Sequence, residues 1–279
     1  MNIAGVVVLY EPDCYVAENI NTYLEYVSKL YVVDNSERES IKTLNAIKLI
    51  EKIEYIFLGG NKGIARALNI GLKKAIEDNF DYLLTMDQDS KFGKGVIECY
   101  FKQCEKIFMN EPKVILSGIN RIGLKKYFEE KEVVDVDETI TSGMVLDVKK
   151  AKNVGMFLEK LFIDYVDYEF CYRAKKYGYC CKLVTNCLLT HQVGNMNPIK
   201  AFGRTFKTHN EHNKVRIYYL TRNALYTIYL YPYTFWRIWM WTIKTLIKIL
   251  LVDDDKKEKL LYSIYGIRDF IQGKSGSYK

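Results

Sequence analysis

The regular alternation of apolar strands with helix-length segments is the feature of this sequence that most limits its fold. Ile3 to Tyr10 reads IAGVVVLY, a continuous apolar run typical of strands that are covered on both faces. Six further segments alternate in type: 16–28 (helix), Leu30 to Val33 (strand), 41–51 (helix), 53–58 (strand), Ile64 to Asp78 (helix) and Tyr82 to Met86 (strand). Strands that alternate with helices in this way form βαβ units. The sequence therefore predicts an α/β fold with a mostly parallel central sheet.

The pattern changes beyond Gly93. Four elements are expected there: a helix to about Asn110, a strand from Val114 to Gly118, a strand around Thr141 to Asp147 and a helix from about Asp167 to Tyr177. We expect one domain over residues 1–208, whose halves, 1–92 and 93–208, form two walls of a cleft. After His209 the chain becomes helical, aromatic and basic, so residues 209–279 are expected to form a separate helical segment.

Composition narrows the class of protein. With 279 residues, of which 49% are hydrophobic, the chain can bury a full core. Its seven cysteines include no Cys-x-x-Cys pair, and its start does not resemble a signal peptide, which favours a reducing cytoplasm. The net charge is +7, but no zinc finger, RNA-recognition signature or helix-turn-helix pattern accompanies it, so nucleic acid is not an expected partner.

Two carboxylates follow the strand that ends near Met86. Sheets of this kind bind ligands at the carboxyl ends of their strands. Asp87 and Asp89 are separated by one residue and lie on the same side of an extended segment, so both can face one hard divalent cation. A solvated turn is the alternative, and it is the commoner explanation of an isolated Asp-x-Asp.

Two other strand ends carry polar or glycine-bearing loops. Asp34 either hydrogen-bonds a nucleotide base or caps the next helix, and the cap is favoured from the residues alone. The stretch Gly59 to Gly63 opens a helix with exposed backbone N–H groups, and Lys62 adds positive charge, which suits a pyrophosphate-bearing ligand. It matches neither Gly-x-Gly-x-x-Gly nor a Walker loop.

Later in the chain, an acid and a histidine are candidates for a catalytic site. Asp167 is expected at a helix N-terminus, where it is either a general base for an acceptor hydroxyl or an ordinary cap, and Arg173 falls about two turns along the same helix. His191 follows a strand and is more often structural than a metal ligand in such a position.

Taken together and in order, these stretches resemble the inverting glycosyltransferases of family 2, which have the GT-A fold, and most closely their bacterial rhamnosyltransferase-like branch. The matching stretches cover about residues 3 to 230: VVVLYEPD, VVDNS, NKGIARALNIGLKKA, TMDQDS, TSGMVLDV, FIDYVDYEFCYRAKKYGY, THQVG and YYLTRNALY. No single stretch is specific, but the ordered set is.

The resemblance implies a role for each candidate residue. It implies that Asp34 recognises the base, that Asp87 and Asp89 contact the ribose and the metal-bound diphosphate, and that His191 completes the metal site. The side chains implied in donor binding are Asp34, Asn61, Lys62, Asp87, Asp89 and Arg173. The two halves of the domain then bind the nucleotide (1–92) and the acceptor (93–208).

The same resemblance assigns the catalytic base to Asp167 and the second acid to Glu169. Many members have Glu-Asp-x-Asp here, but Val166 replaces the Glu, and Asp164 is the alternative candidate for part of the role of Asp167. The implied reaction is a single displacement at the anomeric carbon with Mn²⁺ or Mg²⁺ at the diphosphate.

The implied donor is dTDP-rhamnose and the implied acceptor a lipid-linked saccharide or oligosaccharide of cell-surface polysaccharide synthesis. Three UDP-sugar donors remain alternatives: UDP-galactose, UDP-glucose and UDP-N-acetylglucosamine. A non-catalytic nucleotide-binding scaffold is an alternative of another class, although a scaffold has no need for Asp87, Asp89 and Asp167 together.

The segment Trp236 to Val252 is expected to lie at a membrane surface. It has 17 residues and three cations, which makes it a poor transmembrane span. Helical spacing places Arg237, Lys244 and Lys248 on one face and an apolar set opposite, the pattern of an interfacial helix: Trp239, Ile243, Leu246 and Leu250. Packing on the catalytic domain or on a partner subunit, including a homo-oligomer, is the alternative. The expected location is cytoplasmic, peripheral on the inner face of a bacterial plasma membrane.

Overall fold

The computed structural model describes residues 1–122, 131–191, 196–201, 204–210, 212–253 and 255–278. The chain divides into two compact units. The first contains Met1–Glu159 and Val166–His191, and the second contains Lys160–Tyr165 and Gln192–Lys279. The domain boundary expected after residue 208 falls inside the strand Arg204–Asn210, and the division into domains stays a prediction.

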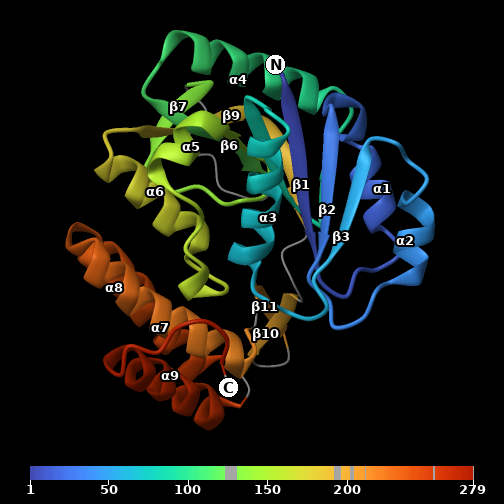
Figure 1. Cartoon of the computed structure of the whole chain (residues 1–279). Helices are drawn as coiled ribbons and strands as arrows, with labels where there is room; N and C mark the ends of the chain where they lie inside the picture. The colour runs from blue at the N-terminus through green and yellow to red at the C-terminus, as the bar shows by residue number, and fades with distance from the viewer. Residues whose placement is uncertain (123–130, 192–195, 202–203, 211, 254, 279) are drawn as a thin grey trace. The chain divides into compact units, whose positions relative to one another are not determined.

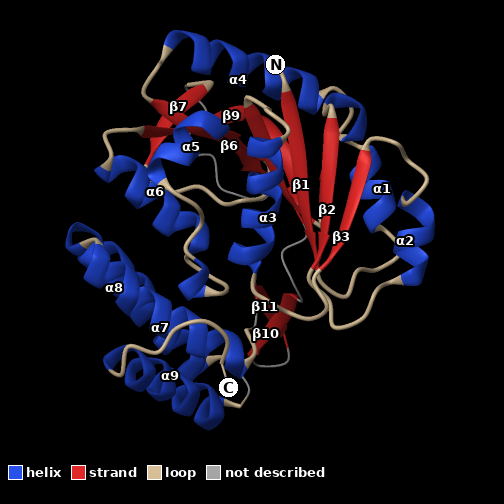
Figure 2. Ribbon diagram, viewed as in Figure 1, coloured by secondary structure: helices blue, strands red, loops and turns tan. Residues whose placement is uncertain are grey.

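The first unit is a sheet with helices packed on both faces (Figures 1 and 2). Its strands are β1 (Ile3–Leu9), β2 (Lys29–Asp34), β3 (Ile53–Phe57), β4 (Tyr82–Asp87), β5 (Ser90–Phe92), β6 (Val114–Arg121), β7 (Val133–Val136), β8 (Met144–Asp147) and β9 (Cys180–His191). Its helices are α1 (Val16–Asn21), α2 (Ile41–Ile47), α3 (Ile64–Glu77), α4 (Val96–Asn110), α5 (Val148–Val154) and α6 (Val166–Lys176). A 3₁₀ turn, η1 (Leu24–Tyr26), follows α1, and η2 (Glu159–Leu161) leads from this unit into the second.

The sheet has the order β3-β2-β1-β4-β8-β6-β9-β5, and β7 pairs with β9. The four strands from β3 to β4 are parallel, as the βαβ pattern predicts. Beyond them β8 runs antiparallel to both β4 and β6, so the sheet as a whole is mixed. The predicted α/β class is confirmed.

The strand β1 is buried along its whole length because helices cover both of its faces. Val7 and Leu9 belong to the core that also contains side chains of α1 and α4. Val6 points to the opposite face, where Gly71 of α3 lies against it. This two-sided burial is the reason why the strand is apolar at every position.

Gly71 lets α3 approach β1 closely, and we predict that Gly71→Ala destabilises the fold. An added Cβ would lie 2.6 Å from Val6 Cβ. Alanine is the better helix former, but overpacking against a core strand costs about 1–3 kcal/mol and outweighs that gain. Chemical denaturation should show the loss. The exposed Lys73→Ala on the same helix should change the unfolding free energy by less than about 0.5 kcal/mol, and a Gly71→Ala protein as stable as the wild type would contradict the prediction.

Several sequence-based boundaries differ from the observed ones. The helix expected over 16–28 is α1 followed by the turn η1, and the helix expected over 41–51 ends at Ile47. The third predicted helix and the fourth predicted strand match α3 and β4 to within one residue.

The second unit combines a β-hairpin with three helices. Its elements are β10 (Met196–Ala201), β11 (Arg204–Asn210), α7 (Lys214–Leu230), the 3₁₀ turn η3 (Pro232–Thr234), α8 (Phe235–Leu251) and α9 (Lys256–Ile271). The hairpin was not expected, because the sequence pattern predicted no strand between His191 and His209 and predicted helices after His209. The helices α7 and α9 pack closely, since a Cβ on Gly266 would lie 2.7 Å from the carbonyl oxygen of Tyr218.

Candidate active site

The parallel register brings two of the predicted acids to the same edge of the sheet. Asp34 ends β2 opposite Leu9, and Asp87 ends β4 opposite Val8. Both carboxylates therefore flank the carboxyl end of β1, where sheets of this topology bind ligands.

Asp87, Asp89 and His191 form one group in the first unit. Each offers a ligand atom, and these atoms lie within 4.8 Å of one another. His191 reaches the acids because the short strand β5 pairs antiparallel with the end of β9, which places Ser90 opposite His191. His191 Nδ1 lies 3.2 Å from Asp89 Oδ1. The hydrogen bond to Asp89 raises the pKa of His191 above its ordinary value, although partial burial opposes this shift.

The donor set of this group suits a hard divalent cation. Two carboxylates and one imidazole, all partly exposed, leave room for water or phosphate oxygens to complete the coordination. Mg²⁺ and Mn²⁺ are the metals that carboxylate, carbonyl and water ligands favour. The residues present therefore fit such an ion.

Two further side chains, which were not predicted, hold this group in place. Ser90 is fully buried, its hydroxyl lies 2.7 Å from His191 Nδ1, and it accepts a hydrogen bond of 2.6 Å from Ser142 Oγ. The Gln88 amide bonds both to the N–H and to the carbonyl of Tyr10, at 2.8 and 3.0 Å. Gln88 thus ties the Asp-x-Asp segment to the end of β1. Its place between the two acids was the only signal for it in the sequence.

Asp34 is fully buried, and protein groups occupy both of its oxygens. Oδ1 accepts from the Ser36 N–H at 3.0 Å, and Oδ2 accepts from the Tyr55 hydroxyl at 2.6 Å. Burial, with the Asp34 carboxylate beside it, raises the pKa of Tyr55. The interpretation of Asp34 as the cap of the next helix was wrong, because Ser40 is the N-cap residue of α2.

The loop before α3 is held by its neighbours. Asn61 accepts from Asn35 Nδ2 and from the Gly63 N–H, both at 3.0 Å. The Lys62 N–H donates to Asn35 Oδ1 at 2.7 Å, and the Asn61 N–H donates to Glu37 Oε1 at 3.2 Å. Because side chains occupy the N–H groups of residues 61–63, the loop offers a ligand its side chains rather than these three amides.

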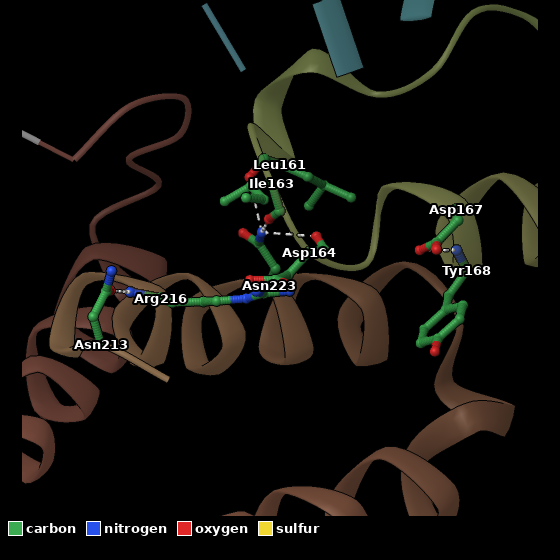
Figure 3. Close-up of polar contacts among 8 residues, drawn as sticks. All are labelled: Leu161, Ile163, Asp164, Asp167, Tyr168, Asn213, Arg216 and Asn223. Carbon is green, nitrogen blue, oxygen red and sulfur yellow. Dashed lines mark hydrogen bonds and ion pairs between the residues drawn. The ribbon is translucent and has the colours of Figure 1, made fainter. Parts of the chain in front are cut away.

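Asp167 lies in the first turn of α6, as predicted, and its Oδ1 accepts from the Tyr168 N–H at 2.9 Å (Figure 3). Its carboxylate is half-buried. Glu169, which is buried, forms a bidentate pair with the partly buried Arg173, with N···O distances of 3.0 and 2.9 Å. Arg173 also donates to the carbonyl of Val154. The guanidinium of Arg173 therefore joins α6 to the end of α5, and its assignment to donor binding stays a prediction.

Asp164, the alternative to Asp167, belongs to the second unit. Its Oδ1 accepts from Arg216 Nη2 at 3.1 Å (Figure 3). Burial raises the pKa of Asp164, and the Arg216 charge acts in the opposite direction. The glycine of the His-x-x-Gly stretch, Gly194, lies outside the described residues.

Comparisons with known proteins agree with this fold. Residues 6–107 match the family model for glycosyl transferase family 2. The chain is 30% identical over 239 residues to the dTDP-rhamnosyl transferase RfbF of Shigella flexneri, and this match covers 80% of the chain and 78% of the relative.

Two solved structures share the fold at low identity. One is GalNAc-T7 with UDP, GalNAc and Mn²⁺ (TM-score 0.56, 14% identity, 68% of this chain and 44% of that one). The other is S. aureus TarS (TM-score 0.51, 15% identity, 97% of this chain and 44% of that one). The chain thus spans less than half the length of either. On the strength of its sequence relative, the chain belongs to glycosyltransferase family 2, and the predicted enzyme class and GT-A fold are confirmed.

Proposed function

We propose that this glycosyltransferase is metal-dependent and inverting, and that it moves rhamnose from dTDP-rhamnose to a hydroxyl of a lipid-linked saccharide. The group of Asp87, Asp89 and His191 carries the proposal, because it offers a divalent cation three ligands. The group lies at the carboxyl end of β4, where sheets of this topology bind ligands. The dTDP-rhamnosyl transferase relative supports the choice of donor.

In the proposed reaction, Asp167 accepts the proton of the acceptor hydroxyl as that oxygen attacks the anomeric carbon from the face opposite the leaving diphosphate. Asp87, Asp89 and His191 would hold the cation, and Asn61 and Lys62 would line the nucleotide pocket. Asp34, whose buried carboxylate already accepts from Ser36 and Tyr55, would take the base as a further donor. When bound, the cation offsets the negative charge that develops on the nucleoside diphosphate.

A UDP-sugar is the alternative donor, favoured by one observation: the similar GalNAc-T7 structure holds UDP. A panel of dTDP- and UDP-sugars, each with and without Mn²⁺, tests both candidates through thermal unfolding and donor hydrolysis. We expect dTDP-rhamnose with Mn²⁺ to raise the melting temperature most, because the proposed donor should bind most tightly. A ligand at 100 times its Kd stabilises the folded state by about 2.7 kcal/mol. If only a UDP-sugar stabilised the protein, that sugar would take the place of dTDP-rhamnose as the proposed donor. If none of the sugars stabilised it, the proposed function would be refuted.

The helix α8 supports a second part of the proposal, attachment to an anionic membrane surface. Among the residues that the structure describes, none of the helices is long and apolar enough to span a bilayer. The exposed side chains of α8 are nevertheless bulky and apolar: Phe235, Trp236, Trp239, Met240, Trp241, Ile247, Leu250 and Leu251. The exposed cations Arg237 and Lys244 lie on the same helix, a composition that suits lipid headgroups.

The observed burial of α8 refines the predicted apolar face. Ile238 and Ile249 are buried, and Thr242, Thr245 and Leu246 line a small cavity shared with α7. The expected face therefore divides, because Leu246 turns toward α7 while Trp239 and Leu250 stay exposed.

Replacement of Trp236 and Leu251 by serine tests the membrane proposal. Each side chain is 73% exposed, and burial of a bulky apolar side chain contributes on the order of 2 kcal/mol, so the double variant should bind phosphatidylglycerol liposomes more than tenfold more weakly in co-sedimentation. Leu49→Ser, at a leucine that is 88% exposed on the first unit, is the matched control and should bind normally. Unchanged binding of the double variant would rule out α8 as the docking element.

A further inference from the structure

The segment that leads into α6 has an unfavourable backbone conformation. Phe162, Asp164 and Tyr165 have φ angles of 67°, 59° and 64°. Residues other than glycine rarely adopt this left-handed region, because the Cβ atom crowds the backbone. In the described part of the chain only six non-glycine residues have positive φ, and three of the six lie within residues 162–165. Such a turn persists only where surrounding contacts hold it.

Asn223 of α7 supplies the central contacts. Its side-chain amide nitrogen donates to the carbonyl oxygens of Leu161, Ile163 and Asp164, at 2.8, 2.6 and 3.1 Å (Figure 3). Asn223 is fully buried, so its amide depends on these carbonyls for hydrogen bonds and has no access to water.

Arg222 completes the attachment from the neighbouring position. Its Nη2 donates to the carbonyls of Lys160 and Leu161, at 3.3 and 3.1 Å, and its Nε donates to Asn223 Oδ1 at 3.0 Å. Arg222 is also fully buried. The two side chains therefore fix each other as well as the turn.

The same face of α7 holds the side chains of the turn. Arg216, Tyr219 and Asn223 are spaced by three and four residues and so lie along one side of the helix. Arg216 pairs with the Asp164 carboxylate, and the Tyr219 ring stacks on Phe162 with centroids 5.2 Å apart. Asn213 caps the start of α7 by accepting from the Arg216 N–H at 2.8 Å. A rigid helix thus contacts both the backbone and the side chains of residues 160–164.

The turn ends one residue before α6 begins at Val166, and Asp167 follows directly. The first turn of α6 continues directly from this turn, so a change in the backbone directions at residues 162–165 would be passed along the chain to Asp167. We propose that Asn223, supported by Arg222, is a positioning residue for Asp167: it holds the left-handed turn whose end sets the place of the catalytic base. This inference rests on the proposed role of Asp167, and it assigns a function to the YYLTRNALY stretch.

Two substitutions remove the contact in different ways. Asn223→Ala removes the amide, and Asn223→Asp keeps the shape and the acceptor for Arg222 but turns a carboxylate oxygen toward three carbonyls. Thr227→Val is the matched control. Thr227 is equally buried one turn further along α7, and its hydroxyl donates within the helix to the Asn223 carbonyl at 2.8 Å. Each full-length protein is assayed for folding by circular dichroism, for amide hydrogen exchange over residues 160–168, and for kcat and KM with dTDP-rhamnose.

We expect both Asn223 variants to fold, to exchange the amides of residues 160–168 faster, and to lose about 100-fold in kcat with KM for the donor changed less than threefold. A displacement of about 1 Å at a reacting group has an effect of this size. Thr227→Val should keep kcat within twofold. The double variant Asn223→Ala/Asp167→Asn should be no slower than Asp167→Asn alone, because a positioning residue acts only through the group that it positions.

Four outcomes would overturn the inference: full kcat in both Asn223 variants, a change confined to KM, losses that multiply in the double variant, or failure of both variants to fold. A fully active Asp167→Asn protein would instead refute the proposed base. Faster exchange over residues 160–168 in the Asn223 variants would then show that the turn is held for another purpose.

Discussion

Asp167→Asn is expected to lower kcat for sugar transfer by about 10³-fold, within the range that general-base catalysis contributes. An amide cannot accept the proton of the acceptor hydroxyl. The asparagine oxygen can still accept the hydrogen bond from the Tyr168 N–H that the carboxylate accepts at 2.9 Å, so the start of α6 should keep its structure. The KM for the donor should therefore change little, and initial rates at saturating donor and acceptor measure the effect.

Two companion substitutions make this result specific. Asp135→Asn changes an exposed aspartate whose side chain is 76% accessible, and it should leave the rate unchanged. Asp164→Asn tests the alternative base. Asn tolerates positive φ and can still accept from Arg216, so we expect less than a tenfold loss. A large loss in Asp164→Asn with a normal rate in Asp167→Asn would exchange the two roles.

The parallel half of the fold was predictable because its signals are local. The strand β1 is apolar at every position since helices cover both of its faces, and α3 shows a clear helical period. Asp34 and Asp87 could then be placed at one edge by the general topology of parallel sheets. Those predictions needed no knowledge of which strands pair.

The remainder depends on pairings between distant residues. Ser90 lies opposite His191, about a hundred residues away, because β5 pairs with β9. The strand β5 is three residues long, too short for a period-two pattern to be recognised. The sequence therefore identified His191 only through a resemblance, and the hydroxyl of Ser90 was not predicted.

The conformation of residues 160–165 was also beyond sequence-based prediction. The residues with positive φ in this segment are Phe162, Asp164 and Tyr165. None of them is a glycine or an asparagine, so the usual sequence signal for a left-handed turn is missing. The turn depends on hydrogen bonds from Asn223, about sixty residues later. Local propensity is overruled here by a tertiary contact, which is the situation expected near functional sites.

Asp89→Ala is expected to lower the rate of transfer at least as much as Asp167→Asn, for a different reason. It removes one of the three ligands in the Asp87, Asp89 and His191 group, and a metal site that loses a carboxylate loses both affinity and the stabilisation of charge on the leaving diphosphate, several kcal/mol in all. Because each 1.36 kcal/mol is a factor of ten, the rate should fall by at least about 10³-fold. Mn²⁺ should also no longer raise the melting temperature of the variant.

The thermal readout separates loss of the ion from loss of the base. Asp167→Asn should keep its stabilisation by Mn²⁺, whereas Asp89→Ala should lose it, and EDTA should bring the wild type to the melting temperature of Asp89→Ala. Asp81→Ala is the matched control, because Asp81 is an exposed aspartate just before the opposite end of β4. If Asp89→Ala kept the Mn²⁺ effect, the ion would bind elsewhere. The assignment of Asp89 as a metal ligand would then be withdrawn.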